Sequence, residues 1–108
     1  MPVLSDFDGT WENIENLWGD IDAIVTGRSY QEFEDFKDEY IGPQKPVFFN
    51  PIATNENNAQ KIVLHKAEMI NRIKATKFYE DQKDEVVKLR LLCPGCKIYW
   101  IRPGVTQI

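Results

Sequence analysis

The feature that most constrains this fold is the alternation of short apolar runs with segments of helical periodicity. Five apolar runs read as β-strands, at residues 3–5, 23–25, 46–51, 76–79 and 97–101, and the third of them is expected to be buried. Between them, apolar residues recur at helical spacing, which is typical of helices that pack one face against a sheet. Right-handed crossovers make such a sheet mostly parallel. The pattern predicts an α/β fold, a three-layer α/β/α sandwich around a five-stranded Rossmann-like sheet.

Four of the intervening segments are expected to be helical. They are a short helix or helical turn at 11–18 stopped by Gly19, a helix at 30–40 capped by Ser29, a helix at about 65–75, and a helix at 86–91 closed by residues 94–95. In the second of them, we expect Phe33, Phe36 and Tyr40 to face inward and the acidic residues to form a solvated face. Residues 52–60 read as a polar loop, and residues 61–64 could be either helical or extended.

The composition is that of an ordinary globular protein. The chain has 108 residues, of which 43% are hydrophobic and 28% are charged, so we expect a single domain over residues 1–108. No apolar run approaches ~18 residues and no signal peptide opens the chain, which predicts a soluble, cytoplasmic protein without membrane contact. The formal net charge of -4 argues against tight, non-specific binding of long nucleic acid.

Two carboxylates follow the first apolar run and precede a glycine. Asp6 and Asp8 would leave the same side of a strand, and a turn at Gly9 can swing the second one around. Acidic side chains at a strand end lose solvation, and a bound hard cation offsets that cost. The sequence therefore predicts two acids at one edge of the sheet, with Mg²⁺ as the expected cofactor.

Other polar residues also follow predicted strands, at the edge where parallel sheets bind ligands. Thr26 and Gly27 come after the second run. Glu80 and Asp81 come after the fourth, and Lys66 lies near the start of the helix that leads into it. A hydroxyl, a cation and two opposed pairs of acids are what phosphoryl transfer through an aspartate needs, because one acid attacks phosphorus and another moves the proton. The metal and the cation neutralise the phosphoryl oxygens.

These residues resemble, in order, the four motifs of the haloacid dehalogenase superfamily. Asp6-Phe7-Asp8-Gly9-Thr10 is similar to the first motif, Val25-Thr26-Gly27-Arg28 to the second, Lys66 to the third and Tyr79-Glu80-Asp81 to the fourth. The resemblance implies that Asp6 is the nucleophile and a metal ligand. It implies that Asp8 is the general acid and base and offers its backbone carbonyl to Mg²⁺. It also implies that Thr26, Gly27 and Lys66 bind the phosphoryl group, and that Glu80 and Asp81 complete the metal site.

Two assignments stay open at this point. Lys61 is an alternative to Lys66, and either Asp81 or Asp84 could support Glu80. The segment at 10–22 is too short for a sizeable cap domain, so the resemblance is to a minimal, capless member of the superfamily.

The leading functional hypothesis is a Mg²⁺-dependent phosphatase that acts through an aspartyl-phosphate. Caps in this superfamily enclose small substrates, so an uncapped site suits a phosphate on something large. A nucleic-acid end, a nucleotide, a protein, or a substrate enclosed by an oligomer would serve. The alternative is a catalytically inactive binding or regulatory module on the same fold, because fold does not entail function.

The two cysteines and one tryptophan are interpreted as packing residues. Cys93 and Cys96 form half of a zinc site, and His65 is the only histidine in the chain. The pair falls between a helix and a strand, whereas a redox pair is expected at a helix start. Trp11 is expected in the core or at its rim rather than as a stacking platform for a base.

Overall fold

The computed structural model describes residues 1–102 and contains five strands, three α-helices and four short 3₁₀ helices. The strands are β1 (Val3–Ser5), β2 (Ala23–Ser29), β3 (Val47–Asn50), β4 (Lys77–Glu80) and β5 (Lys97–Trp100). The α-helices are α1 (Phe33–Glu39), α2 (Ala59–Ile73) and α3 (Lys83–Leu92). The 3₁₀ helices are η1 (Trp11–Asn13), η2 (Glu15–Asp20), η3 (Tyr30–Glu32) and η4 (Thr54–Glu56).

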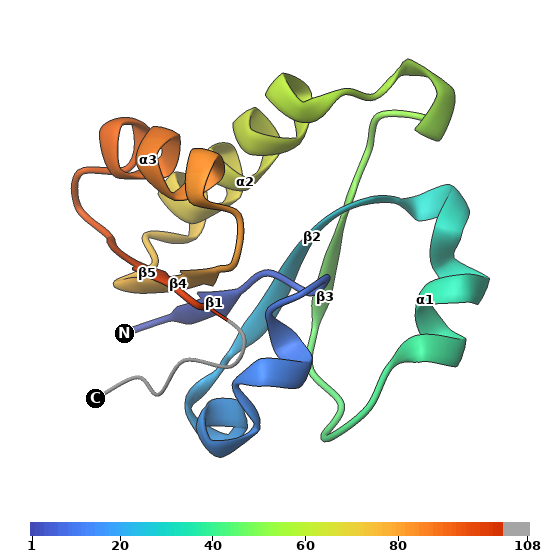
Figure 1. The fold of residues 1–108 in the computed structure, drawn as a ribbon, viewed down its shortest axis with the longest axis horizontal. Coiled ribbons are helices and arrows are strands. Elements are labelled where there is room, and N and C mark those ends of the chain that lie inside the picture. The colour runs from blue at the N-terminus through green and yellow to red at the C-terminus, as the bar shows by residue number, and fades with distance from the viewer. Residues whose placement is uncertain (103–108) are drawn as a thin grey trace.

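All five strands are parallel, in the order β3-β2-β1-β4-β5. The chain therefore leaves the central strand β1 in one direction to form β2 and β3, and then crosses to the other side to form β4 and β5 (Figure 1). This confirms the predicted α/β fold with a parallel Rossmann-like sheet. Parallel sheets of this kind bind ligands at the carboxyl edge where the strand order reverses, which here lies between β1 and β4.

Each face of the sheet carries its own apolar core. On one face, α2 and α3 bury aliphatic residues such as Val63, Ile70 and Leu89 against the strands. The core of the other face is rich in aromatic residues and lies beneath α1 and the 3₁₀ segments, where the ring of Phe7 packs at a tilt against Phe36 with ring centroids 4.2 Å apart. Trp11 is fully buried in this second core, which confirms that it packs rather than faces a ligand.

The connection between β1 and β2 holds only η1 and η2, which are separated at Ile14. The expected helix at 11–18 is thus two short 3₁₀ segments, and Gly19 lies inside η2 rather than ending a helix. No cap domain occurs in the described residues, as expected from the length of this segment. Within residues 1–102, no helix has both the length and the apolar character needed to cross a membrane.

Helix α2 begins six positions earlier than expected, at Ala59 instead of His65. The polar segment before it supplies the reason, because the side chain of Asn58 accepts a hydrogen bond of 2.9 Å from the backbone N–H of Lys61 and caps the helix. Residues 61–64 are therefore helical, and part of the predicted loop at 52–60 is helical too. The helix ends at Ile73, because Lys74 adopts a left-handed conformation with φ 60°.

Several predictions about the β2–α1–β3 region need correction. Strand β2 continues to Ser29, so Thr26 lies inside the strand, next to a register shift against β3. Strand β3 is an edge strand and is only partly buried. Ser29 caps the following segment as expected, but that segment opens as a 3₁₀ turn. Phe33 is 48% exposed and does not face inward; its ring meets Phe49 edge-on and lies beneath the ammonium of Lys37.

Candidate active site and metal centre

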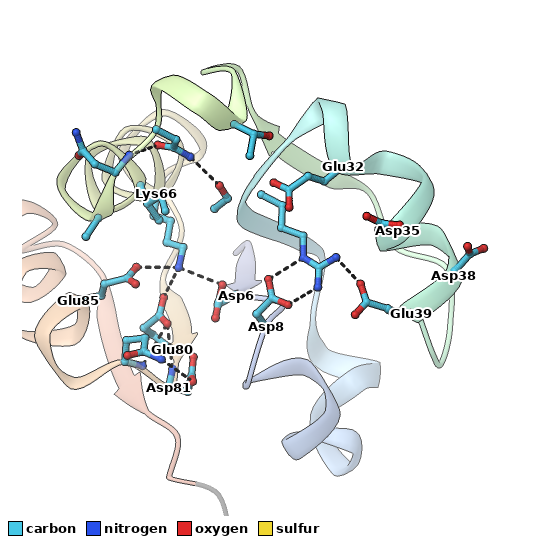
Figure 2. Close-up of a pocket in the computed structure, with 18 residues that line it drawn as sticks. Asp6, Asp8, Glu32, Asp35, Asp38, Glu39, Lys66, Glu80, Asp81 and Glu85 are labelled. Atoms are coloured by element: carbon cyan, nitrogen blue, oxygen red, sulfur yellow. Dashed lines mark hydrogen bonds and ion pairs between the residues drawn. The ribbon is translucent and has the colours of Figure 1, made fainter.

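The carboxyl edge of the sheet borders a cavity of about 890 Å³, which is lined by residues from three strands (β1, β2 and β4) and all three α-helices, or from the turns that flank these elements (Figure 2). The lining residues include nine acids and two cations. The acids are Asp6, Asp8, Glu32, Asp35, Asp38, Glu39, Glu80, Asp81 and Glu85, and the cations are Arg28 and Lys66. A cavity with this charge balance has a strongly negative potential, which favours cations.

Three of these acids are close enough to share one metal ion. Asp6 follows β1, Glu80 ends β4 and Asp81 follows it, and each offers one carboxylate oxygen within 4.8 Å of the other two. Three hard oxygen donors on adjacent strands fit Mg²⁺, which is held by a few carboxylates and keeps part of its hydration. Asp84 is exposed in the first turn of α3 and does not belong to this group, so the structure places Asp81 and not Asp84 beside Glu80. A contribution from the backbone carbonyl of Asp8 stays a prediction.

The turn after β1 packs closely against the carboxylate of Asp81. Gly9 has φ +74°, and a Cβ at this position would lie 2.2 Å from Asp81 Oδ2, so only glycine allows the carboxylate to come this close. The buried hydroxyl of Thr10 lies 3.1 Å from both Asp6 Oδ2 and Asp81 Oδ1, and can donate to one of them at a time. On the other side, the indole N–H of Trp100 donates to the backbone carbonyl of Asp81 at 3.1 Å. These contacts fix two of the three acids relative to each other.

Lys66 is the buried cation of the site. Its ammonium Nζ lies 3.1 Å from Asp6, 2.8 Å from Glu80 and 2.8 Å from Glu85, and its side chain is only 4% exposed. Lys61, in contrast, is exposed in the first turn of α2 and donates to the backbone carbonyl of Glu56. The structure therefore brings Lys66, and not Lys61, next to Asp6.

Burial of this cluster shifts the pKa values of its side chains. Loss of solvation raises the pKa of Asp6 to about 6, although the neighbouring Lys66 opposes the shift. Burial, and then the charge of Asp6, raise the pKa of Glu80 to about 9. Burial alone would lower the pKa of Lys66, but Asp6, Glu80 and Glu85 together raise it well above its ordinary value. Without a metal, the site thus favours the protonated forms of Asp6 and Glu80, and a bound divalent cation would favour their carboxylate forms instead.

Asp8 faces a second cation. Arg28 donates from Nε to Asp8 Oδ2 at 2.9 Å and from Nη2 to Asp8 Oδ1 at 2.6 Å, and from Nη1 to Glu39 Oε2 at 2.5 Å. Figure 2 shows these bonds linking Asp8 to Glu39 across the cavity mouth. The hydrogen bonds to Asp8 and Glu39 raise the pKa of Arg28, which therefore stays charged.

The two predicted phosphate-binding residues of β2 differ in their placement. Gly27 lines the cavity, and a Cβ there would lie 2.6 Å from Ile62 Cγ2, so its small size lets α2 approach the strand. Thr26 is fully buried, does not line the cavity, and its hydroxyl accepts a hydrogen bond of 3.1 Å from the backbone N–H of Arg28. The structure thus brings Gly27 to the site, whereas the hydroxyl of Thr26 binds the backbone of β2 at Arg28.

The acidic residues of η3 and α1 are more than a solvated face. Glu32 accepts a hydrogen bond from the backbone N–H of Ser29, and Glu39 pairs with Arg28. Asp35 and Asp38 also line the cavity, with no ion pair to any described residue. Helix α1 therefore forms an acidic wall of the cavity, defined here as Glu32, Asp35, Asp38 and Glu39.

Sequence reasoning gave no role to three residues of the site, namely Thr10, Arg28 and Glu85. Thr10 and Arg28 each end a stretch that the sequence singled out, so their position directly after Gly9 and Gly27 was an available signal. Glu85 lies in the first turn of α3, where an acid is also favoured by the helix dipole. The sequence alone does not show whether Glu85 serves the site or only stabilises the start of the helix.

Comparisons of this chain with protein-family models, with curated proteins and with solved structures found no significant match.

Proposed function

We propose that this chain is a Mg²⁺-dependent phosphohydrolase of the haloacid dehalogenase type, which cleaves a phosphate monoester through an aspartyl-phosphate. The observation that carries the proposal is the convergence of Asp6, Glu80 and Asp81 within 4.8 Å at the carboxyl edge of the sheet, with Lys66 3.1 Å from Asp6. Burying acids from adjacent strands beside a cation costs folding free energy, and such clusters of perturbed titratable groups are typical of functional sites. Phosphoryl transfer is a reaction that these groups can stabilise.

The chemistry assigns one role to each group. A carboxylate oxygen of Asp6 attacks phosphorus, and the bond to the leaving oxygen breaks as the new P–O bond forms. Asp8 gives a proton to the leaving oxygen, and in the second step it takes a proton from the water that attacks the aspartyl-phosphate. Lys66 lies beside the nucleophile, where its charge would stabilise the phosphoryl oxygens.

Asp6, Glu80 and Asp81 would hold the metal ion. When bound, Mg²⁺ supplies positive charge that reduces the repulsion between the carboxylate and the phosphate. The space that Gly9 leaves around Asp81 keeps that carboxylate oriented toward the other two. These residues are therefore the ones whose loss should remove the response to metal.

The acidic wall bears on the class of substrate. Asp35 and Asp38 face an open cavity, where a flanking strand of phosphates would be repelled. Of the large substrates that suit a capless site, a phosphate on a neutral or basic molecule, such as a phosphoprotein, is therefore favoured over a nucleic-acid end.

One observation favours the alternative, a non-catalytic module. Lys66 already pairs with Asp6 and with Glu80, so much of the negative charge is balanced by the chain itself. A buried network of this kind can persist as a structural element without turnover. Measured hydrolysis decides between the two.

The deciding experiment is hydrolysis of p-nitrophenyl phosphate by the wild-type chain and by Asp6→Asn, with and without Mg²⁺. The proposal expects Mg²⁺-dependent turnover that Asp6→Asn abolishes, because the amide cannot attack phosphorus. Asp84→Asn is the matched control, since Asp84 is exposed outside the site, and it should retain activity. Equal rates for wild type and Asp6→Asn would contradict the proposal.

A further inference from the structure

Arg28 differs from Lys66 in how fully its hydrogen-bond donors are used. The three N–H donors of Lys66 have three carboxylate partners. The guanidinium of Arg28 has five donors, of which three bond to Asp8 and Glu39 in the described part of the chain. Of the two cations that line the cavity, Arg28 is therefore the one with capacity for a further anionic partner.

The partners of Arg28 are also easier to exchange. The side chains of Asp8 and Glu39 are both 55% exposed, whereas those of Asp6 and Glu80, which pair with Lys66, are almost fully buried. Arg28 itself is only 17% exposed, but water can solvate the two exposed carboxylates once they separate from it, so opening this pair costs less than opening the buried pairs of Lys66. A guanidinium binds phosphate with the same fork that it uses for a carboxylate, so a phosphoryl group can replace Asp8 without a change of geometry.

The bond between Arg28 and Asp8 also constrains Asp8. Both carboxylate oxygens of Asp8 accept hydrogen bonds from Arg28. While this fork is closed, both oxygens are held against Arg28, and each keeps one lone pair. Release of the fork lets the Asp8 carboxylate turn toward a substrate beside Asp6, take up a proton from solvent and pass that proton to the leaving oxygen.

We propose that Arg28 exchanges partners during the reaction: its guanidinium leaves Asp8 for the phosphoryl group of the substrate, and this exchange frees Asp8 for acid–base work. Substrate binding and release of Asp8 then become one event, and Glu39 keeps the guanidinium at the cavity mouth throughout. The exchange rests on the proposed function, because it takes phosphate to bind beside Asp6.

The test is calorimetric titration of inorganic phosphate into the Mg²⁺-loaded chain, for wild type, Asp8→Asn, Arg28→Ala and the double variant. If phosphate competes with Asp8 for Arg28, Asp8→Asn should bind phosphate tighter, by about fivefold or more. Arg28→Ala should bind it more weakly, and in that background Asp8→Asn should bring no gain, which is the signature of a shared partner.

A control separates this competition from simple removal of negative charge. Asp35 lines the same cavity without an ion pair in the described residues, so Asp35→Asn removes one charge and leaves the fork intact. A gain in Asp8→Asn no larger than in Asp35→Asn, or a gain that persists in the Arg28→Ala background, overturns the exchange. So does the absence of measurable phosphate binding to every variant.

Arg28→Lys keeps the folded state testable if Arg28→Ala does not fold. An ammonium lacks the planar fork with which a guanidinium binds two oxygens of one group side by side, so Asp8→Asn should gain little in that background either. Failure of the exchange and failure of the proposed function remain distinguishable. If the phosphate-binding results agree with competition but no hydrolysis is measured, the exchange of partners is supported and the proposed activity is contradicted. If Mg²⁺-dependent hydrolysis is measured but the binding results show no competition, the activity is supported and the exchange is contradicted.

Discussion

At the scale of single residues, Lys66 is the side chain that most stabilises the acidic cluster in the absence of metal. It is buried between Asp6, Glu80 and Glu85, and removing one partner of a buried ion pair leaves the others uncompensated. Its position on α2, opposite the ends of β1 and β4, gives it reach to both strands. The same ammonium therefore serves the stability of the fold and the proposed chemistry.

Lys66→Met should destabilise the metal-free chain by about 3–5 kcal/mol, because it removes the charge and keeps the length of the side chain. Urea unfolding without metal measures this loss. Lys61→Met is the matched control on the same helix, since Lys61 is exposed, and should change stability little. Equal effects of the two substitutions would mean that Lys66 does not compensate the acids.

His65 makes a second prediction at this scale. Burial lowers its pKa, with a smaller opposing contribution from a backbone hydrogen bond at Phe48, and its Nε2 is buried without a hydrogen-bond partner among residues 1–102. Because the folded pKa lies below the unfolded value of 6.5, the unfolded chain takes up the proton first. The contribution of neutral His65 to stability is present above pH 6.5 and is lost as the pH falls through the folded pKa.

The free energy of unfolding of wild type should therefore fall between pH 8 and pH 5 relative to that of His65→Gln, which cannot titrate in this range. The comparison cancels the pH dependence of the buried acids, since both proteins contain them. Urea unfolding at several pH values measures the difference. A constant difference between the two proteins across this range would show that His65 is not the titrating group.

At the scale of elements, helix α1 sets the charge of the cavity wall. If Asp35 and Asp38 repel nucleic-acid phosphates, then Asp35→Asn/Asp38→Asn should raise the rate on a phosphate-ended oligonucleotide more than the rate on p-nitrophenyl phosphate. Glu34→Gln/Asp84→Asn is a control of equal charge change, because neither residue lines the cavity. If the hydrolysis rate rises equally on both substrates, the acidic wall does not select between them.

The alternation of strands and helices was predictable because burial on both faces leaves a strong apolar signal in short strands. The start of α2 was not, because Asn58 and Lys61 look like loop residues until the cap forms between them. The placement of Thr26 inside β2 depends on a register shift against β3, which no local pattern encodes. The acids of α1 are exposed, as expected, but their spacing could not show that some of them also line a cavity.

At the scale of the whole molecule, strand order explains why the acids of the site meet. Asp6 leaves β1 and Glu80 ends β4, and these strands are neighbours although most of the chain separates them. The order of motifs along the sequence predicted convergence at one edge. It could not predict that Arg28 would bond to Asp8 and Glu39, because that contact depends on how α1 packs over the opposite face.

The last prediction uses Mg²⁺ to test this convergence. A ligand that binds only the folded state stabilises it by RT ln(1 + [L]/Kd), about 2.7 kcal/mol at a hundredfold excess over Kd. For a chain of this size, each kcal/mol raises the thermal midpoint by about 4–8 °C. Because Asp6, Glu80 and Asp81 are the acids that approach within 4.8 Å, Asp6→Ala and Glu80→Gln/Asp81→Asn should lose most of the rise.

Asp84→Asn should keep the rise in midpoint, because Asp84 is exposed and lies outside the acidic trio. Differential scanning calorimetry at increasing Mg²⁺ measures all four proteins under the same conditions. The thermal midpoints without metal test the same geometry. The midpoint of Asp6→Ala should hold or rise relative to wild type, because removal of one crowded carboxylate relieves like-charge repulsion while Lys66 still pairs with Glu80 and Glu85. A rise of equal size in wild type and in every variant would mean that Mg²⁺ binds elsewhere, and the proposed metal site would then fail together with the activity that depends on it.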